Sequence, residues 1–236
     1  MILVALTGSI AMGKSRAAMM FRAYGVPLFD ADAEVHALFA SGGAAVAQVA
    51  ATFPGCVGLS GAIDRDVLGR AVLNDPGALR RLEGIVHPLV RAGEGRFLRR
   101  ACRAGVPMVL LDIPLLFETG GDGRVDAVAV VSASPLLQGQ RALRRPGMSP
   151  EKLAQIRAKQ TSDWRKRRQA DFVIHSGYDQ GFLATQVGAV IRASLARPAN
   201  AWPARWHGHS SGSKRSRVVR TVSILRSIIA GPLQTS

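Results

Sequence analysis

The sequence predicts an α/β fold: a five-stranded parallel sheet flanked by helices, with a helical insertion and a lid. Five short apolar segments, each bounded by turn or helix signals, are typical of buried strands. Helical patterns fill the stretches between these segments. Strands that alternate with helices favour a parallel sheet that is covered on both faces.

The elements follow one another in a regular order. The strands are expected at 2–7, 26–30, 108–112, 126–131 and 171–175. The helices are expected at 14–24, 32–39, roughly 66–83, roughly 88–104, 135–144, 150–168 and 180–195. Ser149 and Pro150 make a good helix start, because serine caps helices and proline suits the first turn. Residues 31–105 show helical pattern and little strand signal, which indicates a helical insertion.

The net charge of +15 is unevenly distributed along the 236 residues. All 16 acidic side chains lie at or before Asp179, whereas eight of the 31 basic side chains lie after it. Eight of the 15 net charges therefore belong to a C-terminal tail. The moderately basic body suits an anionic small molecule as well as a nucleic acid.

The sequence favours a cytoplasmic protein with no membrane partner. Cys56 and Cys102 cannot form a disulfide framework and lack metal-ligand spacing, so both are expected to be packing residues in a reducing cytosol. No basic region precedes the apolar residues 2–6, so they do not suit a signal peptide. The apolar run 105–117 is too short to span a bilayer and contains an aspartate.

The stretch GSIAMGKS, from Gly8 to Ser15, matches the pattern G-x-x-x-x-G-K-[ST] of phosphate-binding loops and lies between an expected strand and an expected helix. Gly8 and Gly13 allow a sharp turn in which successive N–H groups converge on phosphate oxygens. Lys14 is expected to contact the β- and γ-phosphates, and Ser15 to ligate Mg²⁺. The alternative is a glycine-rich turn that binds nothing.

The stretch DADAEVH directly follows the second expected strand. An acid at the carboxyl end of a parallel strand faces the ligand crevice, where a carboxylate can accept a proton from a substrate hydroxyl. The alternative for Asp32 is that it only caps the following helix. Both roles remain open for this residue.

The stretch LLDIPLLFE places Asp112 at a strand end, where an acid can hold Mg²⁺ through water. Its apolar residues Pro114–Phe117 are expected to form a wall beside the site, although Leu115 and Leu116 also suit a core. Upstream, His87-Pro88 marks either a functional histidine or a helix boundary enforced by proline.

Two arginines of QRALRR, Arg141 and Arg145, are four residues apart and share a helix face. Like charges at that spacing repel one another, which indicates an anion between them. The alternative is a solvated charged surface, the usual explanation of a charge run such as 165–168.

Six stretches, in their order and spacing, resemble the dephospho-CoA kinase family: GSIAMGKS, YGVPLFDADAEVH, HPLV, LLDIPLLFE, QRALRR and QADFVI. They cover residues 1 to about 196, and the DAD and DIPLLFE elements separate this family from most other P-loop kinases. The resemblance implies transfer of the ATP γ-phosphate to the ribose 3′-hydroxyl of 3′-dephospho-CoA, the last step of coenzyme A synthesis. The implied substrates are ATP and 3′-dephospho-CoA, with Mg²⁺ as cofactor.

The resemblance also implies a P-loop kinase fold with three working parts. These are a nucleotide-binding core at 1–30, 105–134 and 170–196, a helical CoA-substrate domain at 31–104 and a basic lid at 135–169. Residues 197–236 extend beyond the family's usual end and have the mixed composition of a disordered basic tail. A monomer is expected, with weak self-association as the alternative.

The resemblance assigns each site residue a role. Catalysis is assigned to Asp32 as the base and to Lys14 and Arg141 as charge-neutralising groups. The residues implied for ATP are Gly8, Ala11, Met12, Gly13, Lys14, Ser15, Arg16 and Arg145. The residues implied for the acceptor are Asp30, Asp32, His87, Pro114, Leu115, Leu116 and Phe117. The implied metal ligands are Ser15 and, through water, Asp112.

Two positions in the loop depart from the family pattern. Ala11 stands where the family usually has glycine, and if that position needs a positive φ, alanine costs about 1 kcal/mol. Arg16 replaces a common threonine, so the hydroxyl is lost although the backbone N–H remains.

Three other functions compete with this interpretation. One is a P-loop kinase that acts on a nucleoside, nucleotide or small metabolite. Another is a GTPase-like switch, which is disfavoured because no convincing N-K-x-D motif follows. The third is nucleic-acid binding through the basic tail, where Trp202 and Trp206 lie near arginines. A solvated tail is the preferred interpretation, so no nucleic-acid partner is expected.

Overall fold

The computed structural model describes residues 1–72 and 75–207, and these form two compact units. The first, here called the sheet unit, contains Met1–Phe29 and the described residues from Arg100 onward. The second, here called the helical unit, contains the described residues of Asp30–Arg99. The helical insertion expected at 31–104 covers nearly the same residues as the helical unit.

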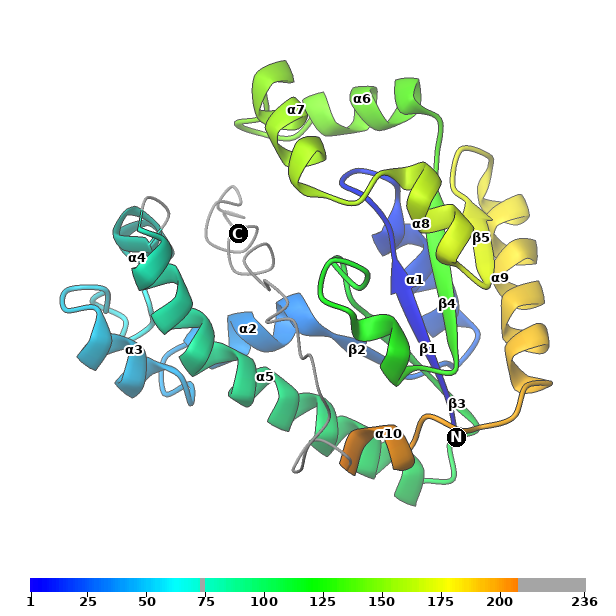
Figure 1. Cartoon of the computed structure of the whole chain (residues 1–236), viewed down its shortest axis with the longest axis horizontal. Helices are drawn as coiled ribbons and strands as arrows, with labels where there is room; N and C mark the ends of the chain where they lie inside the picture. Colours follow the sequence, from blue (N-terminus) through cyan, green and yellow to red (C-terminus); the bar gives the residue numbers. More distant parts are fainter. Residues whose placement is uncertain (73–74, 208–236) are drawn as a thin grey trace. The chain divides into compact units, whose positions relative to one another are not determined.

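The sheet unit is built on five parallel strands in the order β2-β3-β1-β4-β5 (Figure 1). The strands are β1 (Ile2–Thr7), β2 (Leu28–Asp30), β3 (Met108–Asp112), β4 (Ala127–Ser132) and β5 (Phe172–His175). Leu6 lies opposite Asp112 of β3, and Thr7 lies opposite Val130 of β4. The carboxyl ends of β1, β3 and β4 therefore lie together at one edge of the sheet. The predicted α/β class and five-stranded sheet are confirmed.

Helices α1 (Lys14–Ala23) and α9 (Gln180–Leu195) pack against each other and against β1. Their buried side chains Phe21 and Val187 join strand residues such as Val4 and Leu110 in one apolar cluster. Every residue of β1 is buried, as expected of a central parallel strand that is covered on both faces.

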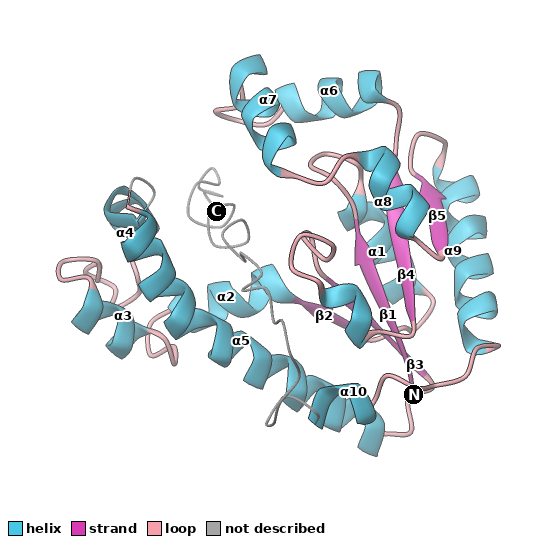
Figure 2. Cartoon of the chain, in the orientation of Figure 1, coloured by secondary structure: helices cyan, strands magenta, loops and turns pink. Residues whose placement is uncertain are grey.

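Three short helices follow β4: α6 (Pro135–Leu143), α7 (Pro150–Lys159) and α8 (Asp163–Gln169). Ser134, Ser149 and Ser162 each accept a hydrogen bond from a backbone N–H of the first turn that follows. The single helix predicted over 150–168 is therefore wrong (Figure 2). Gln160 adopts extended backbone angles that end α7, and the Ser162 cap begins a separate helix.

The helical unit contains α2 (Ala31–Phe39), α3 (Val46–Thr52), α4 (Arg65–Val72) and most of α5 (Pro76–Arg103). They enclose an apolar cluster that includes Phe39, Phe53, Leu68 and Leu82. Helix α3 has no counterpart among the predicted elements.

The helix boundary expected near Pro88 is wrong, because α5 continues through this proline. Val86 and Leu89 on either side of it pack in the apolar cluster, and this packing outweighs the local cost of proline. The helix instead begins at Pro76, where the Asp75 carboxylate accepts a hydrogen bond from the Gly77 N–H at 2.7 Å.

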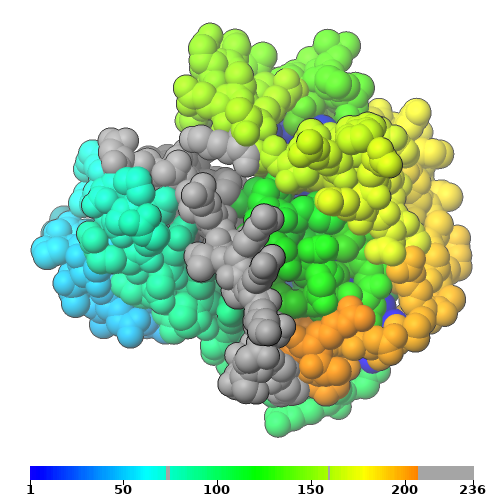
Figure 3. Space-filling model, in the orientation of Figure 1, coloured from blue at the N-terminus to red at the C-terminus, as the bar shows by residue number. Residues whose placement is uncertain are grey.

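Residues 197–207 differ from the disordered tail predicted for 197–236. The Asp126 carboxylate accepts hydrogen bonds from the N–H groups of Asn200 and Ala201, each at 2.8 Å. In the short helix α10 (Ala204–His207), the indole N–H of Trp206 donates to the Arg124 carbonyl at 3.1 Å. Figure 3 shows this orange segment against green residues that precede β4. The rest of the predicted tail, 208–236, lies outside the described residues.

Within the described ranges, no helix is long and apolar enough to cross a membrane.

Candidate active site

The loop between β1 and α1 has the backbone that a phosphate cradle requires. A Cβ atom on Gly8 would lie 2.7 Å from the Val131 carbonyl oxygen, so only glycine fits there. Gly13 immediately precedes α1 with φ 86°, in the left-handed region that favours glycine. The N–H groups of Lys14 and Ser15 begin the helix, where they have no acceptor within the helix and are available to an anion.

Ala11 has φ 59°, so the departure from glycine does fall at a position of positive φ. Its methyl group is buried with Ala142 of α6 and Leu153 of α7. Burial of one methyl group contributes about 0.8 kcal/mol, which is close to the backbone strain of about 1 kcal/mol. The contact therefore offsets most of the strain.

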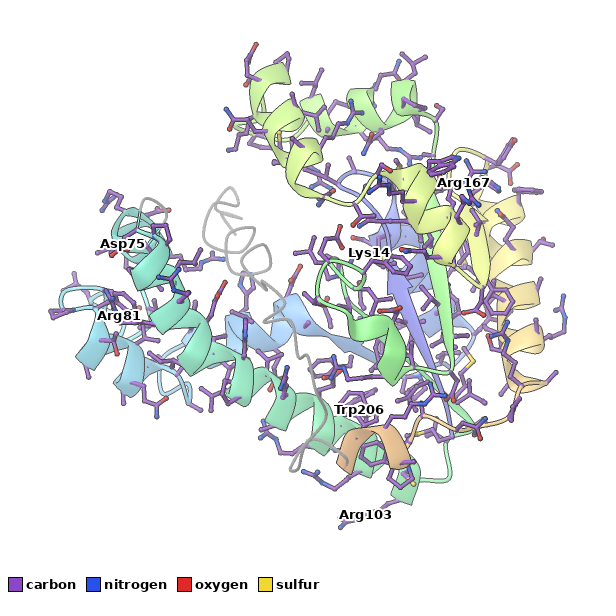
Figure 4. All side chains as sticks on the ribbon, viewed as in Figure 1. Lys14, Asp75, Arg81, Arg103, Arg167 and Trp206 are labelled. Carbon is purple, nitrogen blue, oxygen red and sulfur yellow. The ribbon has the colours of Figure 1, made fainter. Side chains whose placement is uncertain are left out.

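Lys14 forms an ion pair with the buried carboxylate of Asp112 at the end of β3. Figure 4 shows Lys14 beside the strands of the sheet unit. Next to this pair, the Thr7 hydroxyl donates to the Pro114 carbonyl at 3.0 Å, which joins the ends of β1 and β3. The pair places an ammonium group and a carboxylate together at the edge where phosphate is expected.

The donor groups of this edge fit Mg²⁺ bound together with a nucleotide. Ser15 is exposed in the first turn of α1, and Asp112 supplies a carboxylate on the neighbouring strand. Within the described residues, no group of three or more His, Cys, Asp or Glu side chains is placed to hold a metal ion. Mg²⁺ in phosphate sites takes one or two protein ligands and completes its shell with water and phosphate oxygens. One hydroxyl and one carboxylate meet that requirement.

Of the two predicted lid arginines, the structure brings Arg141 to the loop. The Arg141 guanidinium donates to the hydroxyl and to the carbonyl of Ser176, at 2.9 and 2.7 Å. The Ser176 hydroxyl in turn donates to the Met12 carbonyl at 2.6 Å. Burial, and then the charge of Arg16, lower the pKa of Arg141. The shared helix face predicted for Arg141 and Arg145 is wrong, because α6 ends at Leu143 and the exposed Arg145 lies beyond its end.

Sequence reasoning missed three polar residues that hold the loop. Ser176 is fully buried beneath Met12. Gln138 and Gln160 bond to the carbonyl and the N–H of Ile10, at 2.9 and 3.1 Å. An isolated serine or glutamine carries no motif, although Gln138 lies three residues before Arg141 and shares its helix face.

The apolar wall predicted at Pro114–Phe117 is divided in the structure. Leu115 and Leu116 are 2% and 0% exposed, so both are core residues. Pro114 and Phe117 keep partial exposure.

The following residue, Glu118, bonds to the segment that contains the end of α7 and the helix α8. Its carboxylate accepts a hydrogen bond from the Thr161 N–H at 2.7 Å. The same carboxylate oxygen lies 3.0 Å from the ammonium group of Lys166, which is fully buried.

In the helical unit, the capping role belongs to Asp30 and not to Asp32. The Asp30 carboxylate accepts hydrogen bonds from the N–H groups of Asp32 and Ala33, at 2.9 and 3.0 Å. The interpretation of Asp32 as a helix cap is therefore wrong. Asp32 occupies the first turn of α2 and is half-buried.

Two histidines of the helical unit are held toward the neutral form. Burial, and then the charge of Arg91, lower the pKa of His87. Burial and Arg65, whose guanidinium lies 3.3 Å from the ring Nε2, lower the pKa of His36 against the opposing effect of Asp30. His87 lies inside α5 beside Pro88, so it is a helix residue and not a boundary.

Comparisons with known proteins agree on one family. The family model described as dephospho-CoA kinase matches residues 2–180. A dephospho-CoA kinase of Mesorhizobium japonicum is 53% identical over 191 residues, which cover 81% of this chain and 95% of that protein. A dephospho-CoA kinase of Paramagnetospirillum magneticum is 59% identical over 167 residues, which cover 71% of this chain and 78% of that protein.

Solved structures share the fold. A crystal structure of a Thermus thermophilus protein has a TM-score of 0.71 and 31% identity, and covers 82% of this chain and 97% of that one. The dephospho-CoA kinase from Campylobacter jejuni has a TM-score of 0.58 and 23% identity, and covers 81% and 96%. The predicted P-loop kinase fold is confirmed.

Proposed function

The chain belongs to the dephospho-CoA kinase family, and on that premise we propose that it transfers the γ-phosphate of ATP to the ribose 3′-hydroxyl of 3′-dephospho-CoA. The resemblance of the six sequence stretches is confirmed by the family match. The observation that carries the proposal is the glycine-shaped loop that ends in Lys14, within a chain that matches this family over residues 2–180. The products are coenzyme A and ADP.

The sheet unit supplies the donor half of the reaction. The loop N–H groups and Lys14 hold the phosphates of ATP, and Lys14 neutralises charge on the transferring group. Arg141 is the second neutralising group, and its place beside Gly13 supports this role. Arg16 and Arg145 contribute further positive charge near the nucleotide.

Ser15, and through water Asp112, would hold Mg²⁺, which would neutralise charge on the phosphate oxygens. Asp112 bonds to Lys14 and so orients the lysine, and the same carboxylate would hold the metal through water. Both roles require the carboxylate form of Asp112.

For the acceptor we assign Asp32 and His87 in the helical unit, and in the sheet unit Pro114 and Phe117, the two residues of 114–117 that keep partial exposure. Asp32 accepts the proton of the 3′-hydroxyl as the oxygen attacks the γ-phosphorus, and the bond from phosphorus to the β,γ-bridging oxygen breaks to release ADP. Asp30 holds the first turn of α2, which carries Asp32, and His87 offers a neutral ring to the acceptor. The lid at 135–169 excludes water, which otherwise competes as the acceptor.

The proposal includes a monomeric enzyme that works in the cytoplasm. It needs no partner other than its two substrates.

The test supplies Mg²⁺–ATP with 3′-dephospho-CoA, with nucleoside monophosphates, or with no acceptor. We expect phosphorylation of the 3′-hydroxyl of dephospho-CoA, located by phosphorus NMR, and little turnover otherwise. Comparable turnover of a nucleoside monophosphate would replace the proposal with another P-loop kinase activity. Acceptor-independent hydrolysis of GTP would replace it with a switch.

A further inference from the structure

At the tip of the phosphate-binding loop, both the backbone N–H and the carbonyl of Ile10 bond to side chains of the lid, residues 135–169. Ile10 donates its N–H to the side-chain oxygen of Gln160 at 3.1 Å. Its carbonyl accepts a hydrogen bond from the side-chain nitrogen of Gln138 at 2.9 Å. Gln138 lies in α6 and Gln160 directly follows α7, so the two bonds come from separate segments of the lid.

The orientation of the Gln138 amide is fixed by a third group. Arg157 of α7 donates from its guanidinium to the Gln138 side-chain oxygen. An arginine only donates hydrogen bonds, so it requires the amide oxygen on its own side and turns the amide nitrogen toward Ile10. Gln138 is 5% exposed, which removes water as a competing partner.

Apolar packing reinforces the same contact. Ile10 and Ala11 pack against Ala142, Leu153 and Met148, which belong to α6, α7 and the turn between them. The loop tip therefore packs against both α6 and α7. Because the Ile10 N–H is used by Gln160, phosphate must be held by the N–H groups nearer α1.

We infer that Gln138 and Gln160 are positioning residues for ATP, which clamp the backbone N–H and carbonyl of Ile10 so that the phosphate-binding loop keeps its binding shape against the lid. The inference rests on the proposed function in taking this loop as the ATP site. Neither glutamine needs to touch the nucleotide, because each acts through the loop backbone. The clamp predicts weaker nucleotide binding when either bond is lost, with no change in affinity for the acceptor.

The test compares Gln138→Met, Gln160→Met and the double variant with Gln140→Met, which alters an exposed glutamine of the same helix. The dissociation constant of ADP is measured by titration calorimetry on the full chain without acceptor. KM values for ATP and dephospho-CoA and the melting temperature are measured in parallel. Each single variant is expected to raise the ADP dissociation constant about fivefold, the effect of one net hydrogen bond.

The double variant is expected to raise the constant by less than the product of the single effects, because both bonds hold the backbone of one residue. The KM for dephospho-CoA and the Gln140→Met control should match the wild type. ADP binding within twofold of the wild type in both single variants overturns the inference. The inference is also overturned if Gln140→Met weakens ADP binding as much as the single variants do. It is likewise overturned if the double variant raises the ADP dissociation constant by the full product of the single effects.

Two further results keep the test decisive. If Gln138→Met does not fold, Gln138→Glu preserves the shape and the Arg157 contact but removes the donor to Ile10, and it should weaken ADP binding too. If the wild type binds ADP but does not phosphorylate dephospho-CoA, the proposed function fails and the ADP measurements still decide the clamp.

Discussion

The loop between β1 and α1 and the first turn of α2 are held in place by contacts that span very different distances along the sequence. The loop bonds to residues 98, 128, 150 and 164 positions away: Asp112, Gln138, Gln160 and Ser176. The first turn of α2 is held by Asp30, only two and three positions from the N–H groups that it accepts. Changes in the loop should therefore affect activity and stability together, whereas a change of Asp32 should affect activity alone.

The largest effect is expected for Lys14→Met. We expect kcat to fall about 1,000-fold or more, because the charge on the transferring phosphoryl group loses its lysine. The free energy of unfolding should fall by about 3 kcal/mol, because the buried Asp112 carboxylate loses its ammonium partner. Urea unfolding and single-turnover rates provide the measurements. The double variant Lys14→Met/Asp112→Leu should recover the free energy of unfolding but not kcat. If the double variant is as unstable as Lys14→Met, the ion pair does not link stability to activity.

Asp32→Asn should separate activity from stability. We expect kcat to fall about 100-fold to 10,000-fold, the range for loss of a general base. The ADP dissociation constant and the free energy of unfolding should stay at the wild-type values. The matched variant Asp30→Asn keeps an equally good helix cap and so should retain the fold of α2. An active Asp32→Asn enzyme would remove this residue from catalysis.

A chain that ends at residue 196 tests the contacts at the amino-terminal end of β4, away from the candidate site. It lacks the N–H groups of Asn200 and Ala201 that bond to Asp126, and it lacks Trp206. We expect the free energy of unfolding to fall by about 3 kcal/mol, because hydrogen bonds to a charged group are lost. The value of kcat should be unchanged, since these contacts lie at the start of β4 and not at its end. A stability equal to that of the full chain would contradict the docking of residues 197–207.

The pH dependence of stability should distinguish the helical unit from the sheet unit. His87 and His36 have a lowered pKa in the folded protein, so the unfolded chain binds more protons between that pKa and the ordinary value near 6.5. Stability from these groups is present above about pH 6.5 and is lost as the pH falls toward the folded pKa values. Thermal melts from pH 7 to 5 should show the loss, and His87→Gln should reduce it. If the melting temperature of His87→Gln changed with pH as it does in the wild type, His87 would not contribute to the pH dependence of stability.

The smallest effect is expected for Ala11→Gly. The change relieves the strain at φ 59° and removes a buried methyl group. Because these contributions nearly cancel, the free energy of unfolding should change by less than about 1 kcal/mol. Guanidinium unfolding measures the change, with Ala142→Gly as the comparison without positive φ. A loss above about 2 kcal/mol would mean that the packing outweighs the strain.

Much of the architecture could be predicted from the sequence because its signals are local. The apolar runs fix the strands, and the glycine pattern with Lys14 identifies the phosphate loop. The errors arise where tertiary packing overrides local preference. Pro88 continues a helix because its neighbours pack in the cluster, and residues 197–207 are ordered because Asp126 accepts their N–H groups.

The candidate site was predictable only in part for the same reason. Charged and glycine residues of the site occur in recognisable stretches, but Gln138, Gln160 and Ser176 act on backbone atoms far away in sequence. No spacing rule links a glutamine to a carbonyl 128 residues away. The Asp32 cap failed for a simpler reason: Asp30 directly precedes α2 and accepts the N–H groups of its first turn, whereas Asp32 already lies inside the helix.

The Asp126 carboxylate also bears on how the protein completes its fold during synthesis. One of its oxygens accepts the N–H of Leu3, and the other accepts the N–H groups of Asn200 and Ala201. The N–H of Leu3 in β1 therefore lacks this acceptor until Asp126 is synthesised. The same carboxylate also accepts the N–H groups of Asn200 and Ala201, which are synthesised later still. The ribosome must translate beyond residue 201 before all of these hydrogen bonds to Asp126 can form. During most of its synthesis, the nascent chain therefore lacks part of the contacts at the amino-terminal ends of β1 and β4.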